Sequence, residues 1–320
     1  MRMRQLHDDL RPSGELGLLL LLGVLWGMPY ALTKLSLATI PPLTLVAGRL
    51  VIAATVLWIV VAILGRKVPL TRSFFVGVAV QGCIGCVIPY TLIAFGQKSV
   101  DSALAAILNS TTPLFVCFVS VMWMRHEHLT VSRLAGVSAA LGGVIAVAGG
   151  SSLSGLGQEI WGQAAILLAT FSSACATIYG RRFSGVAPEV AAAGMLSCAA
   201  LILTPASLLL ETPWRSTPSA LSLAALIANA AVATALGFVI YFRLIRTIGI
   251  LGTASAGYLK PAVGVLIGCV VLGETVTWTM MVGLAAILAG VAVINTSAPT
   301  ATVMTTERVG WRWRKHRPAV

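Results

Sequence analysis

The chain has 320 residues, of which 58% are hydrophobic and only 10% are charged, and its formal net charge is +12. A soluble domain carries roughly 25% charged residues, so this composition excludes a water-soluble globular protein and predicts that most of the surface faces lipid. The basic residues stand between apolar segments, which favours membrane topology over nucleic-acid binding as the reason for the positive charge.

Ten long apolar segments, separated by charged residues or by Pro, Gly and Ser, predict ten membrane-spanning helices. A helix needs roughly 20 apolar residues to cross about 30 Å of hydrocarbon, and these segments are too long and continuous for β-barrel strands. No small-residue cleavage site follows the first segment, so we expect a retained helix rather than a signal peptide. The predicted spans are residues 16–38, 43–64, 74–96, 102–123, 131–149, 160–180, 187–210, 219–241, 251–272 and 276–295.

The distribution of lysine and arginine predicts the orientation of these spans. One set of loops and tails carries 17 of the 22 Lys and Arg residues, whereas the alternate loops carry only Lys98 and Arg215. Basic residues accumulate on the cytoplasmic side of a membrane, so both termini are predicted to be cytoplasmic. The basic C-terminal tail suits an anionic lipid surface, or is an unstructured cytoplasmic segment.

The second half of the chain repeats the first. Pro113 and Pro261 are 148 residues apart, and an ordered series of matches follows them after a one-residue gap. The same offset pairs Gln81 with Asn229. The matches after the prolines are Glu127 with Glu274, Thr130 with Thr277, Gly136 with Gly283, and Gly143 with Gly290.

Each half holds five predicted spans, and because five is odd the second half enters the membrane in the opposite sense. Two such halves are related by a pseudo-two-fold axis in the membrane plane, as in many secondary transporters, which bind their solute near the midplane. The predicted fold is therefore an all-α integral membrane protein with ten transmembrane helices arranged as two inverted five-helix repeats. Its predicted segments are an N-terminal tail over 1–15, repeats over 16–149 and 160–296, and a C-terminal tail over 297–320.

Several short motifs resemble the EamA family of the drug/metabolite transporter superfamily. The sequence LGET at 272–275 is complete in the second repeat and degraded to MRHEHLT at 124–130 in the first. Trp26-Gly27 followed by Lys34, and an arginine at Arg49, also look like the family's pattern. The resemblance implies a ten-helix carrier of the inner membrane, usually an exporter of amino acids or related metabolites.

Acidic and histidine side chains are predicted to lie outside the centres of all ten spans. Proton coupling through a midplane carboxylate or imidazole therefore has no support in the sequence. His126 and His128 fall on different helix faces, which argues against a metal site, and the C-x-x-C pair Cys83 and Cys86 is interpreted as small buried residues. We expect no catalytic residue, no metal and no cofactor.

Two prolines lie within predicted spans and are predicted to break or gate their helices. Proline removes a hydrogen-bond donor, which frees the carbonyl groups of Asn109 and Gly257, four residues before Pro113 and Pro261. Free carbonyl groups at membrane depth are tolerated where they line a cavity. The alternative is that both prolines only kink the packing.

Lys260 is the charged residue that most needs an explanation. It lies about eight residues into its predicted span, whereas Lys34 and Arg49 lie nearer the outer ends of theirs and are expected to reach outward. Its repeat partner is Thr112, so the charge belongs to one half only. We hypothesise that Lys260 faces a central cavity and attracts a substrate carboxylate; the alternatives are a neutral buried amine or a side chain extended along its helix.

Further polar and aromatic side chains within spans complete the candidate site, although hydrogen bonding between helices is their commoner role. Structural roles are expected for Gly136, Gly283, and for Glu127 and Glu274, each meeting amide groups at the start of the next helix. The candidate substrate-binding residues are Lys260, Tyr258, Asn109, Thr112, Gln81, Asn229 and Trp26.

Together with the family resemblance, these features favour a secondary transporter that exports amino acids or related small polar metabolites across the inner membrane by alternating access, and not an enzyme. An integral membrane enzyme acting on lipid-linked substrates is the alternative, but it needs a convergent acid, histidine or nucleophile. A receptor or scaffold would leave the inverted repeat unexplained. The expected partners are a small solute and membrane lipids, with a homodimer left open and no nucleic acid.

The charge asymmetry generates a test of topology. A single cysteine at Gly155, in a variant whose six native cysteines are replaced, should react with a membrane-impermeant maleimide from outside the cell, because residue 155 lies in an outer loop of the ten-helix arrangement. Reaction only after the membrane is opened would contradict that arrangement.

Overall fold

The computed structural model describes residues 2–123, 131–152, 158–248, 253 and 256–296. Within these residues every regular element is helical. The predictions for Glu127, for the surrounding histidines, for the loop containing residue 155 and for the tail 297–320 fall outside the described part of the chain. Helix α1 begins at Arg2, so it extends through the segment predicted as an N-terminal tail.

The helices fall where the apolar segments predicted them. Seven helices in the described residues are long and apolar enough to cross a membrane, and three shorter apolar helices, 135–146, 256–272 and 278–293, occupy the remaining predicted positions. This confirms the all-α membrane fold. The first half contains α1 (Arg2–Gly27), α2 (Pro29–Leu37), α3 (Pro42–Ile63), α4 (Arg72–Gly82), η1 (Cys83–Val87), α5 (Ile88–Gly96), α6 (Ser102–Asn109), α7 (Thr112–Trp123) and α8 (Val131–Ser152).

The second half has the same order of spans. It contains α9 (Gln158–Tyr179), η2 (Gly180–Phe183), α10 (Pro188–Leu210), η3 (Pro213–Arg215), α11 (Ala220–Ile227), η4 (Ala228–Leu236), α12 (Gly237–Thr247), α14 (Ala256–Leu272) and α15 (Trp278–Thr296). Large apolar side chains such as Ile63, Leu209 and Trp278 are exposed on the outside of the bundle. An apolar outer surface of this kind suits a lipid environment.

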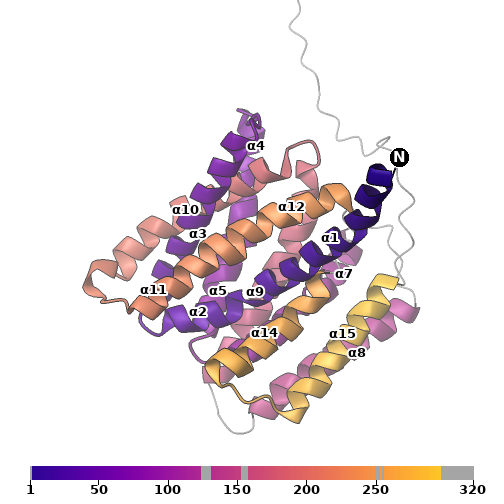
Figure 1. The fold of residues 1–320 in the computed structure, drawn as a ribbon. Coiled ribbons are helices and arrows are strands. Elements are labelled where there is room, and N and C mark those ends of the chain that lie inside the picture. The colour runs from indigo at the N-terminus through magenta and orange to yellow at the C-terminus, as the bar shows by residue number, and fades with distance from the viewer. Residues whose placement is uncertain (1, 124–130, 153–157, 249–252, 254–255, 297–320) are drawn as a thin grey trace, which may run out of the picture.

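The helix contacts are those of a pseudo-two-fold arrangement. Helix α3 packs on α10, and α8 packs on α15, so in each case the two copies of one span contact each other (Figure 1). The contact of α1 with α14 has its counterpart in the contact of α9 with α6 and α7. These contacts between the halves follow the symmetry that inverted repeats require.

Matched glycines form the closest of these crossings. A Cβ atom added at Gly143 would lie 2.7 Å from the carbonyl oxygen of Gly283, and one added at Gly290 would collide with the carbonyl oxygen of Gly136. Gly136 and Gly283 are repeat partners, as are Gly143 and Gly290, so the two-fold axis exchanges these contacts. Such reciprocal contacts characterise an isologous two-fold interface.

Two π-helical segments, which the sequence analysis did not predict, also obey the repeat. The π-helix η1 interrupts the third span, and adding the offset of 148 places its counterpart at 231–235, inside the π-helix η4 of the eighth span. A π-helical segment accommodates extra residues within an α-helix and is common at functional sites. Both halves therefore carry the same irregularity at the same position.

Ion pairs gather basic loops at one end of the bundle. Arg246 pairs with the buried Glu189, Arg66 lies 3.9 Å from the same carboxylate, and Arg243 lies 3.4 Å from Glu15. Arg66 lies in a loop and Arg243 and Arg246 in the last turns of α12, and the charge distribution assigns all three positions to one side of the membrane. We call this the N-terminal end, and the opposite end, formed by the connections 38–41, 97–101, 211–219 and 273–277, the distal end.

The glycine crossing generates a matched test of stability. Gly143→Ala should lower the thermal stability of the purified protein, since overpacking costs on the order of 1–3 kcal/mol and the new methyl group meets backbone atoms of α15. Gly142→Ala is the control, because nothing lies within 4 Å of a Cβ atom there. Both changes gain the same helix propensity. Equal melting temperatures for the two variants would contradict this packing.

Candidate functional site

The fourth span is broken in its middle. Helix α6 ends at Asn109 and α7 begins at Thr112, with Pro113 in its first turn. Pro113 has no amide hydrogen, so the carbonyl oxygen of Asn109 lacks its usual helical partner. The hydroxyl group of Thr112 donates to that oxygen at 2.7 Å, and the hydroxyl group of Thr111 donates to the carbonyl oxygen of Leu108 at 2.7 Å. Side chains therefore stabilise the break within the membrane.

Pro261 does not break its helix, which corrects the prediction that the two prolines act alike. Helix α14 runs without interruption through Pro261. The residues that correspond to Ser110, Thr111 and Thr112 are Tyr258, Leu259 and Lys260. The hydroxyl groups of the first-half residues bond to carbonyl oxygens of the preceding turn, where α6 ends. The second-half residues at these positions have no such short hydroxyl side chains. Among the described residues of α14, no break corresponds to the one between α6 and α7.

The side chain of Asn109 joins the two halves at this break. Its amide oxygen accepts a hydrogen bond from the hydroxyl group of Tyr30 at 2.7 Å and another from Nζ of Lys260 at 2.6 Å. Its amide nitrogen donates to Oγ1 of Thr170 at 3.3 Å. Tyr30 and Asn109 belong to the first half, whereas Thr170 and Lys260 belong to the second. We call these four residues the Asn109 cluster.

The side-chain amine of Lys260 has no acidic partner among the described residues. No carboxylate of the described part of the chain lies within 4 Å of Nζ, which lies 5.7 Å from the centroid of the Tyr30 ring. Asn109 is the eighth residue of α6, so it lies about 10 Å from the distal start of that helix at 1.5 Å per residue. Nζ of Lys260 therefore lies well inside the bundle, where an ionisable side chain is costly and usually functional.

Arg49 forms a second polar cluster that the sequence analysis missed. We expected this side chain to reach toward the outer membrane surface, but its Nε donates to Oγ1 of Thr234 at 2.9 Å and its guanidinium carbon lies 4.3 Å from the centroid of the Tyr90 ring. Thr234 in turn donates to the carbonyl oxygen of Asn229, within η4, at 2.7 Å. The π-helical segment of the second half thus positions an arginine of the first half.

The two clusters share one region of the bundle. A chain of hydrogen bonds leads from Arg49 through Thr234 and Asn229 to Thr33 of α2, one turn from Tyr30 of the Asn109 cluster. The only sequence signal for this role was an arginine inside a span at a position where the resembling family often has one. The direction of its side chain was missed because an arginine near the end of a span can reach either the membrane surface or polar groups inside the bundle.

The remaining candidate residues lie elsewhere. Trp26 packs in an aromatic group with Tyr241 and Phe238, at centroid distances of 5.1 and 6.4 Å. Gln81 donates to the carbonyl oxygen of Ala176 at 3.2 Å, and Tyr258 packs against the buried residues around α6 and α14.

Asn229 and Gln81, the matched amides, each keep one oxygen uncommitted. The amide nitrogen of Asn229 donates to Oγ1 of Thr33 at 3.1 Å, while its Oδ1, like Oε1 of Gln81, is buried with no hydrogen-bond partner in the structure. Of the seven candidate ligands, the structure joins Lys260 and Asn109 directly and places Thr112 one turn away. Tyr30, Thr170 and Arg49 were not among the predicted ligands.

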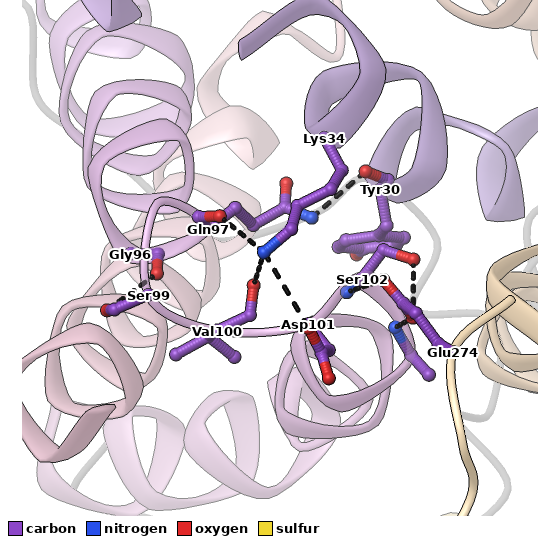
Figure 2. Close-up of polar contacts among 10 residues, drawn as sticks. Tyr30, Lys34, Gly96, Gln97, Ser99, Val100, Asp101, Ser102 and Glu274 are labelled. Carbon is purple, nitrogen blue, oxygen red and sulfur yellow. Dashed lines mark hydrogen bonds and ion pairs between the residues drawn. The ribbon is translucent and has the colours of Figure 1, made fainter. Parts of the chain in front are cut away.

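Polar contacts near Tyr30 attach the connection 97–101 to α2 at the distal end. Nζ of Lys34 donates to the carbonyl oxygens of Gln97 and Val100 at 3.0 and 2.9 Å and lies 3.7 Å from Asp101 (Figure 2). The side-chain amide of Gln97 donates to the carbonyl oxygen of Tyr30 at 2.9 Å. The connection before α6 is therefore attached to α2.

Glu274 binds a helix start, but not the one that we predicted. Its carboxylate accepts hydrogen bonds from the amide groups of Ser102 and Ala103, both at 2.8 Å, and from the hydroxyl group of Ser102 (Figure 2). These amides begin α6 of the first half rather than α15, the next helix. The reason is that the first-turn amides of a helix bind an anion from any part of the chain that brings one near.

Comparison with known proteins identifies the chain. Residues 14–149 and 160–296 each match the EamA-like transporter family. The chain belongs to the EamA-like transporter family. It is 30% identical over 290 residues to a probable amino-acid metabolite efflux pump of Salmonella typhimurium strain LT2, covering 88% of this chain and 93% of the relative.

Other relatives agree with this family. An uncharacterised inner membrane transporter of Escherichia coli strain K12 is 26% identical, over 92% of this chain and 93% of the relative. A probable terminal-alkyne amino-acid exporter of Streptantibioticus cattleyicolor is 26% identical, over 87% of this chain and 92% of the relative. A solved crystal structure shares the fold, with a TM-score of 0.62 and 20% identity over 90% of this chain and 99% of the other.

The unequal prolines generate a paired test of transport. Pro113→Ala restores an amide donor for the Asn109 carbonyl and should let α6 continue into α7, which moves the Asn109 side chain away from Lys260. Loss of that charge-assisted hydrogen bond should slow the flux of a transported solute about tenfold or more. Pro261→Ala is the control, because α14 is already continuous. Equal slowing by both variants would contradict the assignment.

Proposed function

We propose that the protein is a secondary transporter that exports amino acids or related small polar metabolites by alternating access, with Lys260 holding the substrate carboxylate. The observation that carries this proposal is an ammonium group inside the bundle with no described carboxylate within 4 Å, bonded across the two halves to Asn109. The relatives named as an amino-acid metabolite efflux pump and an amino-acid exporter support the substrate class and the direction.

A substrate carboxylate would compete with Asn109 for Nζ of Lys260. An oxygen that carries a full negative charge makes a stronger hydrogen bond with an ammonium group than a neutral amide oxygen does. Binding would therefore loosen a contact that joins the halves, since Asn109 and Lys260 belong to different repeats. In this proposal the repeats 16–149 and 160–296 move relative to each other and expose the site to either side in turn.

The proposal extends to the membrane setting. Both termini lie in the cytoplasm, and the distal end faces outward. The partners are the solute and the surrounding lipids, with a homodimer still open. A membrane enzyme remains the rival hypothesis, and recovery of a labelled solute in unchanged chemical form separates transport from catalysis.

Lys260 supplies the decisive test. Lys260→Met should reduce counterflow of amino acids in proteoliposomes at least about tenfold, because it removes the charge-assisted hydrogen bond. Lys260→Arg should keep part of the activity. Lys98→Met is the matched control, since Lys98 is an exposed lysine of the distal end.

A folded methionine variant that transports at the wild-type rate would remove Lys260 from the site. Folding is judged independently by monodispersity and melting temperature in detergent. If wild-type protein moves no amino acid at all, the substrate class proposed above is wrong.

A further inference from the structure

Arg49 is a second cation inside the bundle, and most of its hydrogen-bonding capacity is uncommitted. A guanidinium group has five N–H donors, and the structure records one hydrogen bond, from Nε to Thr234. No carboxylate of the described residues lies within 4 Å of it. Arg49 is only partly buried, and its terminal nitrogens are not among the buried atoms that lack partners. They are therefore not sealed inside the packed interior.

The site of Arg49 is built to hold the guanidinium in one orientation. The Tyr90 ring lies against it, with 4.3 Å between the guanidinium carbon and the ring centroid, and Thr234 fixes Nε. These contacts leave the edge formed by the two terminal nitrogens for another partner. That edge matches the two oxygens of a carboxylate, which it binds through parallel hydrogen bonds.

Arg49 and the Asn109 cluster lie at a common depth. Arg49 is the eighth residue of α3 and Asn109 the eighth of α6, and both helices begin at the distal end. At 1.5 Å per residue each lies about 10 Å from that end. Both clusters also attach to α2, the Arg49 cluster at Thr33 through Asn229 and the Asn109 cluster at Tyr30, one turn away. One cation comes from each half of the protein.

Two neighbouring cations inside a membrane-embedded bundle repel each other, and no carboxylate of the described residues lies within 4 Å of either one. Charges interact more strongly there than in water, so an occupant with a single carboxylate would neutralise only one of them. An occupant with two carboxylates would neutralise both.

We propose that the preferred substrates carry two carboxylate groups, as acidic amino acids do, with one group on Lys260 and the other on Arg49. This inference rests on the proposed function and narrows its substrate class. Arg49 is then a specificity-determining residue, and Tyr90 and Thr234 are positioning residues that act through it.

Glutamate and glutamine provide a matched pair of probes, because they have similar size and differ in the second negative charge. Wild-type protein in proteoliposomes should favour glutamate over glutamine by about ten- to hundredfold in flux, the range expected for one charge-assisted contact. Arg49→Met should bring the ratio close to one. Arg49→Lys should give an intermediate ratio, because a point charge cannot make the bidentate contact. Arg215→Met, at the distal end, should keep the wild-type ratio.

The flux ratio distinguishes recognition from a structural role. If Arg49 only anchors Thr234 and Tyr90, Arg49→Met slows both probes alike and the ratio stays high, which overturns the inference. A wild-type protein that moves glutamine as fast as glutamate, or moves neutral amino acids while excluding glutamate, also overturns it but leaves the proposed function standing. Failure of wild-type protein to move any amino acid overturns both proposals.

Discussion

An ammonium group inside a lipid-embedded bundle is the constraint on which the arrangement of the central residues depends. Every polar group at that depth needs a partner within the protein, because lipid offers none. Lys260 meets this requirement through the amide oxygen of Asn109. Asn109 is also the last residue of α6, and the hydroxyl group of Thr112 binds its backbone carbonyl oxygen. The break in the fourth span and the contact between the two halves therefore meet at one residue.

The scaffold is symmetric, whereas the central residues are not. The pairs α3 with α10 and α8 with α15, the reciprocal glycine contacts and the two π-helical segments all follow the pseudo-two-fold relation. Lys260 has Thr112 as its repeat partner, and Asn109 has Gly257. A symmetric scaffold allows the halves to exchange conformations. A small solute has no such symmetry, so its ligands can differ between the halves.

Carboxylates at the distal end, like Asn109 at the centre, satisfy polar groups of the other half of the protein. Glu274 binds the first amides of α6, and Glu211 accepts hydrogen bonds from the amides of Leu43 and Thr44 at the start of α3, at 2.9 and 2.7 Å. In each case a glutamate of the second half satisfies a helix start of the first half. Exposed amides at a helix start attract negative charge, and this charge also joins the two repeats.

The sequence by itself determined the spans, the repeat and its inversion, because lipid imposes a length and an apolar composition on every crossing helix. It also identified Lys260 and Asn109 as candidates, since a charge and a proline-freed carbonyl group are conspicuous in apolar segments. Only the tertiary structure decided which polar groups meet. The direction of Arg49, the partner of Glu274, the continuity of α14 and the role of Tyr30 all depend on contacts between residues far apart in the chain. Local sequence cannot specify those contacts, because each side chain had more than one partner within its reach.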